Sequence, residues 1–323
     1  MKVYATRMLP QAGVDMLTAA GIPLTQFEGR QALNQDELIE ICKHYDAVIC
    51  AGQKLGAAFF EACPHLKCVA LLSVGYDNVD LQAASHLNIP VTNTPGVLDA
   101  STAETAFLLM MATARKAFFM HQYILDGHWG FTDPTANLGI DLEGKTVGIF
   151  GLGNIGTVFA KYCKSFYQSP IIYHNRNRNI AAENLLDARY VSFEELLRES
   201  DVLSVHANLS ASTRGIFNKD TFIKMKSSSI FINAARGGIH DENDLYEAIV
   251  EGQIWGAGLD VTNPEPMLPN NPLLRLPTVS ILPHIGSATE GTRAAMAILA
   301  AKNIIAARDG MPLPNLVNKD ALS

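Results

Sequence analysis

The stretch TVGIFGLGNIG at residues 146–156 decides the fold, because it joins a buried apolar run to glycines at a fixed spacing. In the pattern G-x-G-x-x-G between a strand and a helix, the first glycine makes a tight turn. The second lets the backbone approach a pyrophosphate, and the third lets the helix pack on the strand. The helix N-terminus adds free N–H groups and a positive dipole end. We therefore predict a dinucleotide site formed by Gly151, Leu152, Gly153, Asn154, Ile155 and Gly156.

Short apolar runs alternate with helical patterns on both sides of this stretch. They occupy residues 3–5, 47–51, 68–72 and 89–91 before it, and 170–173, 201–206, 229–233, 256–260 and 279–283 after it. Continuous apolar runs with helices between them are typical of parallel strands that are buried on both faces. The sequence therefore predicts an α/β protein with doubly wound sheets.

The domain organisation follows from length and from two long helical stretches. A chain of 323 residues is too long for one ordinary core, which favours two domains. Helical stretches at about 101–126 and 287–309 begin at Ser-x-x-Glu capping boxes, and a third box lies at 192–195. Since one long helix precedes the second series of strands and the other follows it, we expect that series to be an inserted domain. We predict a substrate domain of residues 1–99 and 288–323, and a dinucleotide domain of residues 100–287.

Composition excludes several classes of partner. The net charge of −7 argues against a nucleic-acid surface, which needs clustered Lys and Arg. No apolar run reaches the roughly 18–20 residues that span a bilayer, and the N-terminus lacks the apolar region of an export signal. The five cysteines cannot all pair and lie mostly in apolar segments. We expect a cytoplasmic protein with reduced thiols, no membrane or nucleic-acid partner and no metal.

The segment YHNRNRN at residues 173–179 bears on the cofactor. The second strand of a dinucleotide unit normally ends in an acid that binds the ribose 2′-hydroxyl of NAD, about 20 residues after the glycines. Here no acid occurs between Pro170 and Ala182. Arg176 and Arg178 would match a 2′-phosphate, and Asn175 would replace the acid that repels it. The sequence favours NADP(H) over NAD(H), although Asn and Arg also suit a solvated turn.

Three later motifs carry groups that hydride transfer to a ketone needs. NAARGG (233–238), LDVTNPEP (259–266) and LPHIGSAT (282–289) each follow an apolar run and together supply an arginine, an aspartate, a glutamate and a histidine. A cation can hold a substrate carboxylate and polarise its carbonyl, and an acid can protonate the developing alkoxide. A histidine titrates near neutral pH and can exchange that proton in both directions.

With these motifs in order, the sequence closely resembles the D-2-hydroxyacid dehydrogenase family, from SVGYDNVD (73–80) and VTNTPGV (91–97) to PHIGSAT. The resemblance implies a Rossmann domain inserted into a flavodoxin-like substrate domain. Within the family the sequence is most similar to glyoxylate/hydroxypyruvate (2-ketogluconate) reductases. That implies hydride transfer from NAD(P)H to a small 2-oxo acid, hydroxypyruvate to D-glycerate or glyoxylate to glycolate.

The resemblance also implies the residue roles. His284 would be the general acid in reduction, Glu265 would orient it and Arg236 would bind the 2-oxo acid. The backbone of Val74, Gly75 and Tyr76 would receive the substrate carboxylate. The cofactor would be lined by Thr102, Asn208, Thr213, Ala234, Asp260, His284 and Gly286. The chain departs from the family at Asn208, where a proline is usual, and at His240, where a β-branched residue is usual.

Other activities remain open at this point. The same fold serves D-lactate and 3-phosphoglycerate dehydrogenases, although a phosphorylated substrate would want a basic cluster near residues 73–76, where only Lys54 and Lys67 are close in sequence. Some relatives are cofactor-sensing binding proteins. The apolar helix at 101–120 carries more apolar residues than one domain needs, so we predict a homodimer built around it.

Overall fold

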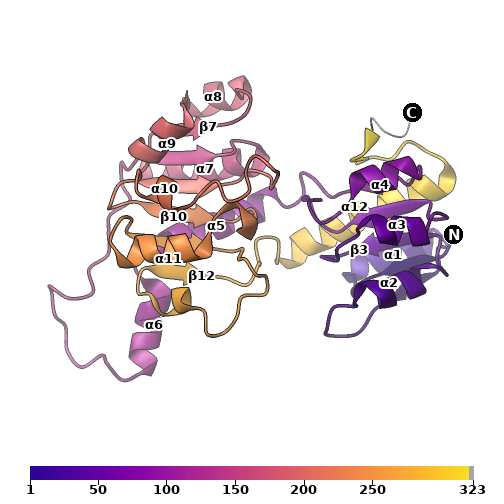
Figure 1. Cartoon of the computed structure of the whole chain (residues 1–323), viewed down its shortest axis with the longest axis horizontal. Helices are drawn as coiled ribbons and strands as arrows, with labels where there is room; N and C mark the ends of the chain where they lie inside the picture. The colour runs from indigo at the N-terminus through magenta and orange to yellow at the C-terminus, as the bar shows by residue number, and fades with distance from the viewer. Residues whose placement is uncertain (320–323) are drawn as a thin grey trace. The chain divides into compact units, whose positions relative to one another are not determined.

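A computed structural model describes residues 1–319 of the chain, which forms two compact units (Figure 1). The first unit consists of Met1–Leu98 and Ala288–Ser323, and the second of Asp99–Ser287. Residues 320–323 of the predicted substrate domain lie outside the described residues. Each unit is an α/β body built on one parallel sheet.

The first unit contains a five-stranded parallel sheet in the order β2-β1-β3-β4-β5. Its strands are β1 (Val3–Ala5), β2 (Leu24–Gln26), β3 (Ala47–Cys50), β4 (Cys68–Leu71) and β5 (Val91–Thr92). Its helices are α1 (Gln11–Ala19), α2 (Gln35–Cys42), α3 (Ala57–Ala62), α4 (Leu81–His86) and α12 (Glu290–Asp309). The central strands β1, β3 and β4 are buried along their whole length, as the apolar runs predict.

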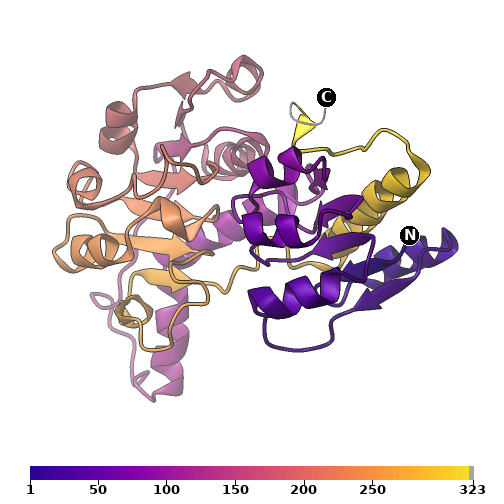
Figure 2. The ribbon, with the colours of Figure 1, turned by 45° about the vertical axis from the view of Figure 1, so that its right-hand side comes forward.

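The C-terminal segment belongs to this first unit because it packs there. Helix α12 lies against α1 and β4, and its long ribbon runs beside the sheet in Figure 2. A Cβ at Gly13 of α1 would lie 2.7 Å from the Cβ of Ala297, so a glycine lets the two helices approach closely. Beyond the helix, the Asn318 side chain accepts a hydrogen bond from the Val91 backbone of β5 at 2.9 Å.

The second unit contains a seven-stranded parallel sheet in the order β12-β11-β10-β9-β6-β7-β8. Its strands are β6 (Val147–Phe150), β7 (Ile171–His174), β8 (Arg189–Tyr190), β9 (Val202–Val205), β10 (Ile230–Asn233), β11 (Gly256–Leu259) and β12 (Val279–Ile281). The strand order reverses between β6 and β9. In such sheets ligands bind outside the carboxyl ends of the strands at that switch point.

The helices of the second unit cover both faces of this sheet. They are α5 (Asp99–Ala114), α6 (Ala117–Leu125), α7 (Asn154–Tyr167), α8 (Ile180–Leu186), α9 (Phe193–Glu199), α10 (Lys219–Phe222), α11 (Glu242–Val250) and the 3₁₀ turns η1 (Gly237–Ile239) and η2 (Pro272–Arg275). Ile149 and Ile232 pack in one core with α5 and α7, whereas Phe150 and Phe231 pack in another with α9 to α11. Alternate residues of one strand thus enter opposite cores, which confirms the predicted doubly wound class.

Two predicted helices differ from those observed. The stretch 101–126 is broken at Lys116, whose φ of 54° ends the first helix, so α5 and α6 replace one long helix. Helix α5 begins at Asp99, which places Ser101 inside it, and α12 takes its cap from Thr289. Two of the three predicted capping boxes are therefore wrong, and only the Ser192–Glu195 box forms. No helix in residues 1–319 is both long and apolar enough to cross a bilayer.

Candidate active site

The glycine-rich turn between β6 and α7 has room for a pyrophosphate. Gly151 has a φ of +99°, and a Cβ there would lie 2.5 Å from the backbone nitrogen of Ala207. A Cβ at Gly156 would lie 2.6 Å from the carbonyl oxygen of Gly151, so glycine lets α7 approach the turn. A Cβ at Gly153 would meet no atom within 4 Å, and no side chain caps α7. Because packing does not require Gly153, this position fits a phosphate that approaches the bare helix N-terminus.

Two asparagines after β7 hold this turn. The Oδ1 atom of Asn175 accepts the N–H of Leu152 at 2.6 Å, and its Nδ2 atom donates to the Leu152 carbonyl. The Nδ2 atom of Asn179 donates to the same carbonyl at 2.9 Å while its Oδ1 atom caps α8. Asn175, predicted to stand at the ribose, thus uses both ends of its amide on the glycine-rich turn. Asn179 was not predicted from the sequence, although its place just before a helix is a capping signal.

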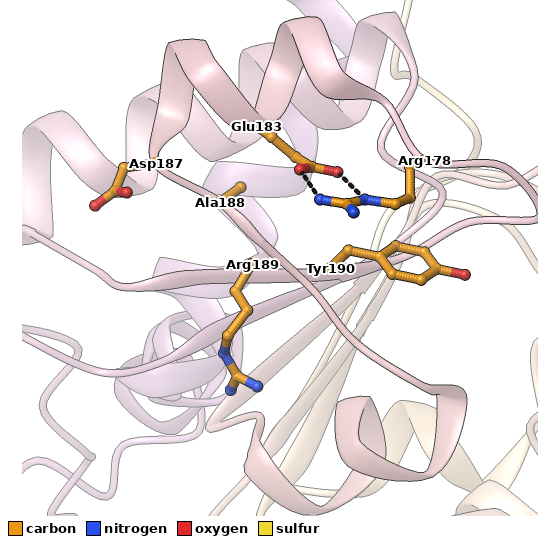
Figure 3. A pocket seen from close by; sticks show the side chains of 6 residues that line it. All are labelled: Arg178, Glu183, Asp187, Ala188, Arg189 and Tyr190. Atoms are coloured by element: carbon orange, nitrogen blue, oxygen red, sulfur yellow. Dashed lines mark hydrogen bonds and ion pairs between the residues drawn. The ribbon is translucent and has the colours of Figure 1, made fainter.

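The two arginines of the segment 173–179 have different surroundings. Arg178 forms a two-point ion pair with Glu183, Nη2 to Oε2 at 2.6 Å and Nε to Oε1 at 3.0 Å (Figure 3). The hydrogen bond from Arg178 holds the pKa of the Glu183 carboxyl below its ordinary value. The guanidinium also lies 5.8 Å from the centre of the Tyr190 ring. Arg176 is exposed and, within residues 1–319, joins no ion pair.

A surface cavity of about 380 Å³ lies beside the Arg178–Glu183 pair. Its lining comes from α8, β8, the segment between them and the loop before α8, and consists of Arg178, Glu183, Asp187, Ala188, Arg189 and Tyr190 (Figure 3). The carboxylate of Glu183 points to Arg178, whereas Asp187 stands apart from it. Because the carboxylate of Glu183 already neutralises Arg178, this cavity offers less positive charge than the sequence pair Arg176 and Arg178 suggests.

Asp260 is the buried anchor of the turn that contains His284. It follows β11 and is 1% exposed. Its Oδ1 atom accepts the N–H of Ile285 and its Oδ2 atom that of Gly286, both at 2.8 Å. Burial raises the pKa of this carboxyl, although the two N–H bonds act against the rise. A Cβ at Gly286 would lie 3.0 Å from Asp260 and 3.3 Å from the Thr102 methyl, so these three predicted cofactor residues lie together.

His284 and Glu265 form the hydrogen-bonded pair that the motifs predict. The Nδ1 atom of His284 bonds the Oε1 atom of Glu265, although 19 residues separate them. Partial burial tends to raise the pKa of Glu265, but the bond and charge of His284, helped by the charge of Arg236, bring it below its ordinary value. Since Nδ1 is occupied, Nε2 is the nitrogen of His284 that remains for proton exchange with a substrate.

Arg236 lies in a turn that follows β10 and packs against the segment leading to Glu265. A Cβ at Gly237 would lie 1.9 Å from the carbonyl oxygen of Thr262, so only a glycine permits this contact. The Nη1 atom of Arg236 donates to its neighbour Ala235 at 2.8 Å. Ala234, also predicted to line the cofactor, lies directly after the strand and is 8% exposed. The arginine, the glutamate and the histidine therefore share one edge of the second sheet.

Asn208 and Thr213 belong to one loop after β9. Thr213 donates its hydroxyl proton to the Asn208 carbonyl at 2.7 Å, and the Asn208 side chain is exposed. The loop is therefore closed by its own hydrogen bonds at the carboxyl edge of the sheet. No bond from the Asn208 side chain to the described part of the chain is present.

The predicted carboxylate-binding loop belongs to the first unit. Val74, Gly75 and Tyr76 follow β4, and Tyr76 is 38% exposed. The Asn93 side chain donates to the Val74 carbonyl at 2.8 Å, and Ser73 donates its hydroxyl proton to the Gly75 carbonyl at 2.8 Å. Because a carbonyl oxygen only accepts hydrogen bonds, the backbone N–H groups are what the loop can offer to an anion. Asn93 was not predicted from the sequence.

Comparison with known proteins gives a consistent family. Residues 107–286 match the family described as "D-isomer specific 2-hydroxyacid dehydrogenase, NAD binding domain". A glyoxylate reductase from Thermococcus litoralis is 41% identical over 100% of this chain and 98% of its own length. Glyoxylate/hydroxypyruvate reductase B from Salmonella gallinarum is 40% identical, over 87% of this chain and 89% of the relative. A crystal structure of an NADPH-dependent glyoxylate/hydroxypyruvate reductase from Sinorhizobium meliloti, in complex with NADP and malonate, is 31% identical with a TM-score of 0.84, covering 98% of this chain and 96% of that one.

Proposed function

The chain belongs to the D-isomer-specific 2-hydroxyacid dehydrogenase family, and we propose that it reduces glyoxylate and hydroxypyruvate with a nicotinamide cofactor. The observation that carries the proposal is the His284–Glu265 pair beside the Arg236 turn at the carboxyl edge of a dinucleotide-binding sheet. In this proposal the second unit binds the cofactor, and the backbone N–H groups of residues 74–76 are assigned to the substrate carboxylate.

In the proposed reaction the protein holds the acid and moves one proton. The bound dinucleotide supplies a hydride for the carbonyl carbon. Arg236 holds the substrate carboxylate and polarises the carbonyl. The Nε2 atom of His284 gives its proton to the carbonyl oxygen as the alcohol forms, and the charged ring is stabilised by the Glu265 carboxylate before and during the transfer. Asp260 keeps the turn that bears His284 closed.

We test the activity by following nicotinamide absorbance with glyoxylate and with hydroxypyruvate, each with NADPH and NADH. Turnover of either acid is expected. D-lactate and 3-phosphoglycerate, assayed in the direction of oxidation, are the alternative substrates. Absence of turnover with both oxo acids, together with turnover of one alternative substrate, would overturn the substrate assignment.

We propose further that NADPH is preferred and that Arg176 supports this preference. Arg176 is exposed after β7 and unpaired within residues 1–319, whereas Arg178 is held by Glu183. Arg176→Ala is expected to lower kcat/KM for NADPH by roughly 10- to 150-fold and to leave kcat/KM for NADH nearly unchanged, since one charge-assisted bond is worth about 1.5–3 kcal/mol. Arg189→Ala, which removes an arginine paired with Glu199 in the same region, is the matched control. Equal losses with both cofactors would contradict the proposal.

We also propose a homodimer, with its apolar contact on α6 rather than on α5. Nine of the 16 residues of α5 are buried in the second unit, whereas no residue of α6 is buried. The large exposed apolar side chains of α6 and the segment after it are Phe118, Ile124, Leu125, Trp129, Phe131 and Leu138. Light scattering is expected to give twice the chain mass of 35.0 kDa. Phe131→Asp should move the mass toward one chain, and a monomeric wild-type protein would contradict the proposal.

The thiols support the proposal of a reducing, cytoplasmic location. All five cysteines are free and buried. Burial raises the pKa of the Cys42 and Cys68 thiols to about 12, which makes both unreactive at neutral pH. Titration of the denatured protein with a thiol reagent is expected to find all five thiols, and a protein isolated with a disulfide would argue for another compartment.

A further inference from the structure

We propose that His240 is a positioning residue for Arg236, acting through the side chain of Asn233. This inference rests on the proposed function, in which Arg236 binds the carboxylate of the 2-oxo acid. His240 directly follows the 3₁₀ turn η1. It ends the turn that begins at Asn233 and carries Arg236.

The orientation of the Asn233 amide is set by two backbone groups. Its Oδ1 atom accepts the N–H of Ala235 at 3.0 Å, and its Nδ2 atom donates to the carbonyl of Arg236 at 2.9 Å. A backbone N–H can only donate and a carbonyl can only accept, so the amide cannot be turned over. Asn233 is fully buried, which excludes water as an alternative partner on its surface.

This orientation determines the state of His240. The Nδ1 atom of His240 lies 3.0 Å from the same Nδ2 atom of Asn233, which is a donor. Nδ1 must therefore accept, and the proton of the neutral ring stands on Nε2. The ring is 2% exposed, and its Nε2 atom has no hydrogen-bond partner in the described structure. The buried His240 ring therefore accepts a hydrogen bond from Asn233 at Nδ1, whereas its Nε2–H donor is unpaired in the described structure.

The bond closes the turn that carries Arg236. Backbone bonds hold His240 to the neighbouring segment, since Phe217 donates to Ile239 at 3.2 Å and accepts from Asp241 at 2.9 Å. Asn233 is held at the other end by β10. The bond between the Asn233 and His240 side chains joins these two anchored ends of the turn. It keeps the Asn233 amide in the orientation in which its Nδ2 atom donates to the Arg236 carbonyl. The guanidinium of Arg236 then starts from a backbone that cannot rotate freely, which lowers the entropy lost when it binds a carboxylate.

The test compares three substitutions of His240. His240→Asn places an amide oxygen near the position of Nδ1 and keeps the acceptor. His240→Gln places its polar atoms near the position of Nε2 and loses that acceptor, and His240→Val keeps no polar atom. We expect KM for hydroxypyruvate and glyoxylate, and the inhibition constant of oxalate, to rise about 3- to 10-fold in the Gln and Val variants, the range of one ordinary hydrogen bond. The Asn variant should stay within about 2-fold of the wild type.

Two readouts separate positioning from general damage. KM for the cofactor and the thermal midpoint should not follow the loss of oxo-acid affinity, because the glycine-rich turn is remote from His240 in sequence and held by its own asparagines. His86→Val, at an exposed histidine of α4, is the control and should match the wild type. Equal oxo-acid KM values in the wild type and in the Asn, Gln and Val variants would overturn the inference, as would an Asn variant no better than the Gln variant. An inactive wild-type enzyme would instead be a failure of the proposed function.

Discussion

His284 adopts a φ of 54°, in the left-handed region that a non-glycine residue seldom occupies. The next two residues donate their N–H groups to the two oxygens of Asp260, so the strained turn is held from behind by a buried carboxylate. The backbone that presents the His284 imidazole, the proposed proton donor, therefore depends on a residue that does not need to touch the substrate.

Asp260→Asn should loosen this turn. An amide offers one oxygen, so either Ile285 or Gly286 would face an NH₂ group and lose its acceptor. We expect about 1–3 kcal/mol less free energy of unfolding in urea and a clear loss of kcat. Asp241→Asn is the control, because Asp241 caps α11 with a single oxygen, Oδ1, that an asparagine retains. Similar losses in both variants would show that the doubled contact at Asp260 is unimportant.

The His284–Glu265 pair gives two predictions, one for each residue. His284→Ala should lower kcat by about 10²- to 10⁴-fold with little change in cofactor affinity, because the proton donor is lost. Turnover at the wild-type rate would refute the assigned role.

Glu265→Gln should lower kcat less than His284→Ala does, because the imidazole stays in place but loses the carboxylate that orients it. In the wild type the pKa of Glu265 is held below its ordinary 4.5, with burial opposing and His284 outweighing it. The carboxylate is thus present at neutral pH and is lost only as the pH falls through that lowered value. A pH–rate profile of both proteins checks this: the loss of kcat that follows protonation of Glu265 at low pH should appear in the wild type and be absent from the Gln variant.

At the scale of elements, the turn from β6 to α7 separates two reasons for a glycine. Gly156→Ala should destabilise the protein, because its Cβ would lie 2.6 Å from the Gly151 carbonyl. Gly153→Ala should keep the thermal midpoint, because no atom lies within 4 Å of its Cβ. The same substitution should lower the affinity for the cofactor by about 10-fold or more, because the added methyl would meet the phosphates. Thermal unfolding and cofactor titration of the two variants form a matched pair. A stable Gly153→Ala protein with wild-type cofactor affinity would argue against phosphate binding at this turn.

At the scale of the whole molecule, buried histidines couple stability to pH. Burial lowers the pKa of His240 to about 4 and that of His206 to about 3, from an ordinary value of 6.5. The unfolded chain takes up these protons near pH 6.5 and the folded chain does not, so stability falls as the pH falls from about 6.5 toward about 4. Each such group contributes at most about 1.4 kcal/mol per pH unit. His240 is the histidine to test, because it is 2% exposed in the folded chain.

His240→Asn should therefore make the free energy of unfolding fall less steeply than in the wild type between pH 6 and pH 5. Urea unfolding at both pH values measures the difference, and the carboxylates, common to both proteins, cancel. Parallel curves would mean that His240 is already protonated in the folded protein.

The sequence by itself determined the features of this protein that depend on local pattern. Apolar runs predicted the central strands, and the G-x-G-x-x-G turn predicted the strand-to-helix junction, because burial and turn geometry act over a few neighbouring residues. Local pattern was weaker at helix ends: Ser101 and Ser287 satisfy the capping motif, yet tertiary packing starts α5 and α12 elsewhere. It also missed the short edge strands β2 and β8, which carry little apolar signal.

Only the tertiary structure decided which polar side chains meet. Asn175 and Asn179 turn to Leu152, Glu183 takes Arg178, and Asn233 joins His240. A donor near an acceptor in sequence has many competing partners, and the bond that forms depends on which groups burial leaves without water. Chemistry-bearing residues could therefore be named from the sequence, whereas the contacts that hold them in place could not.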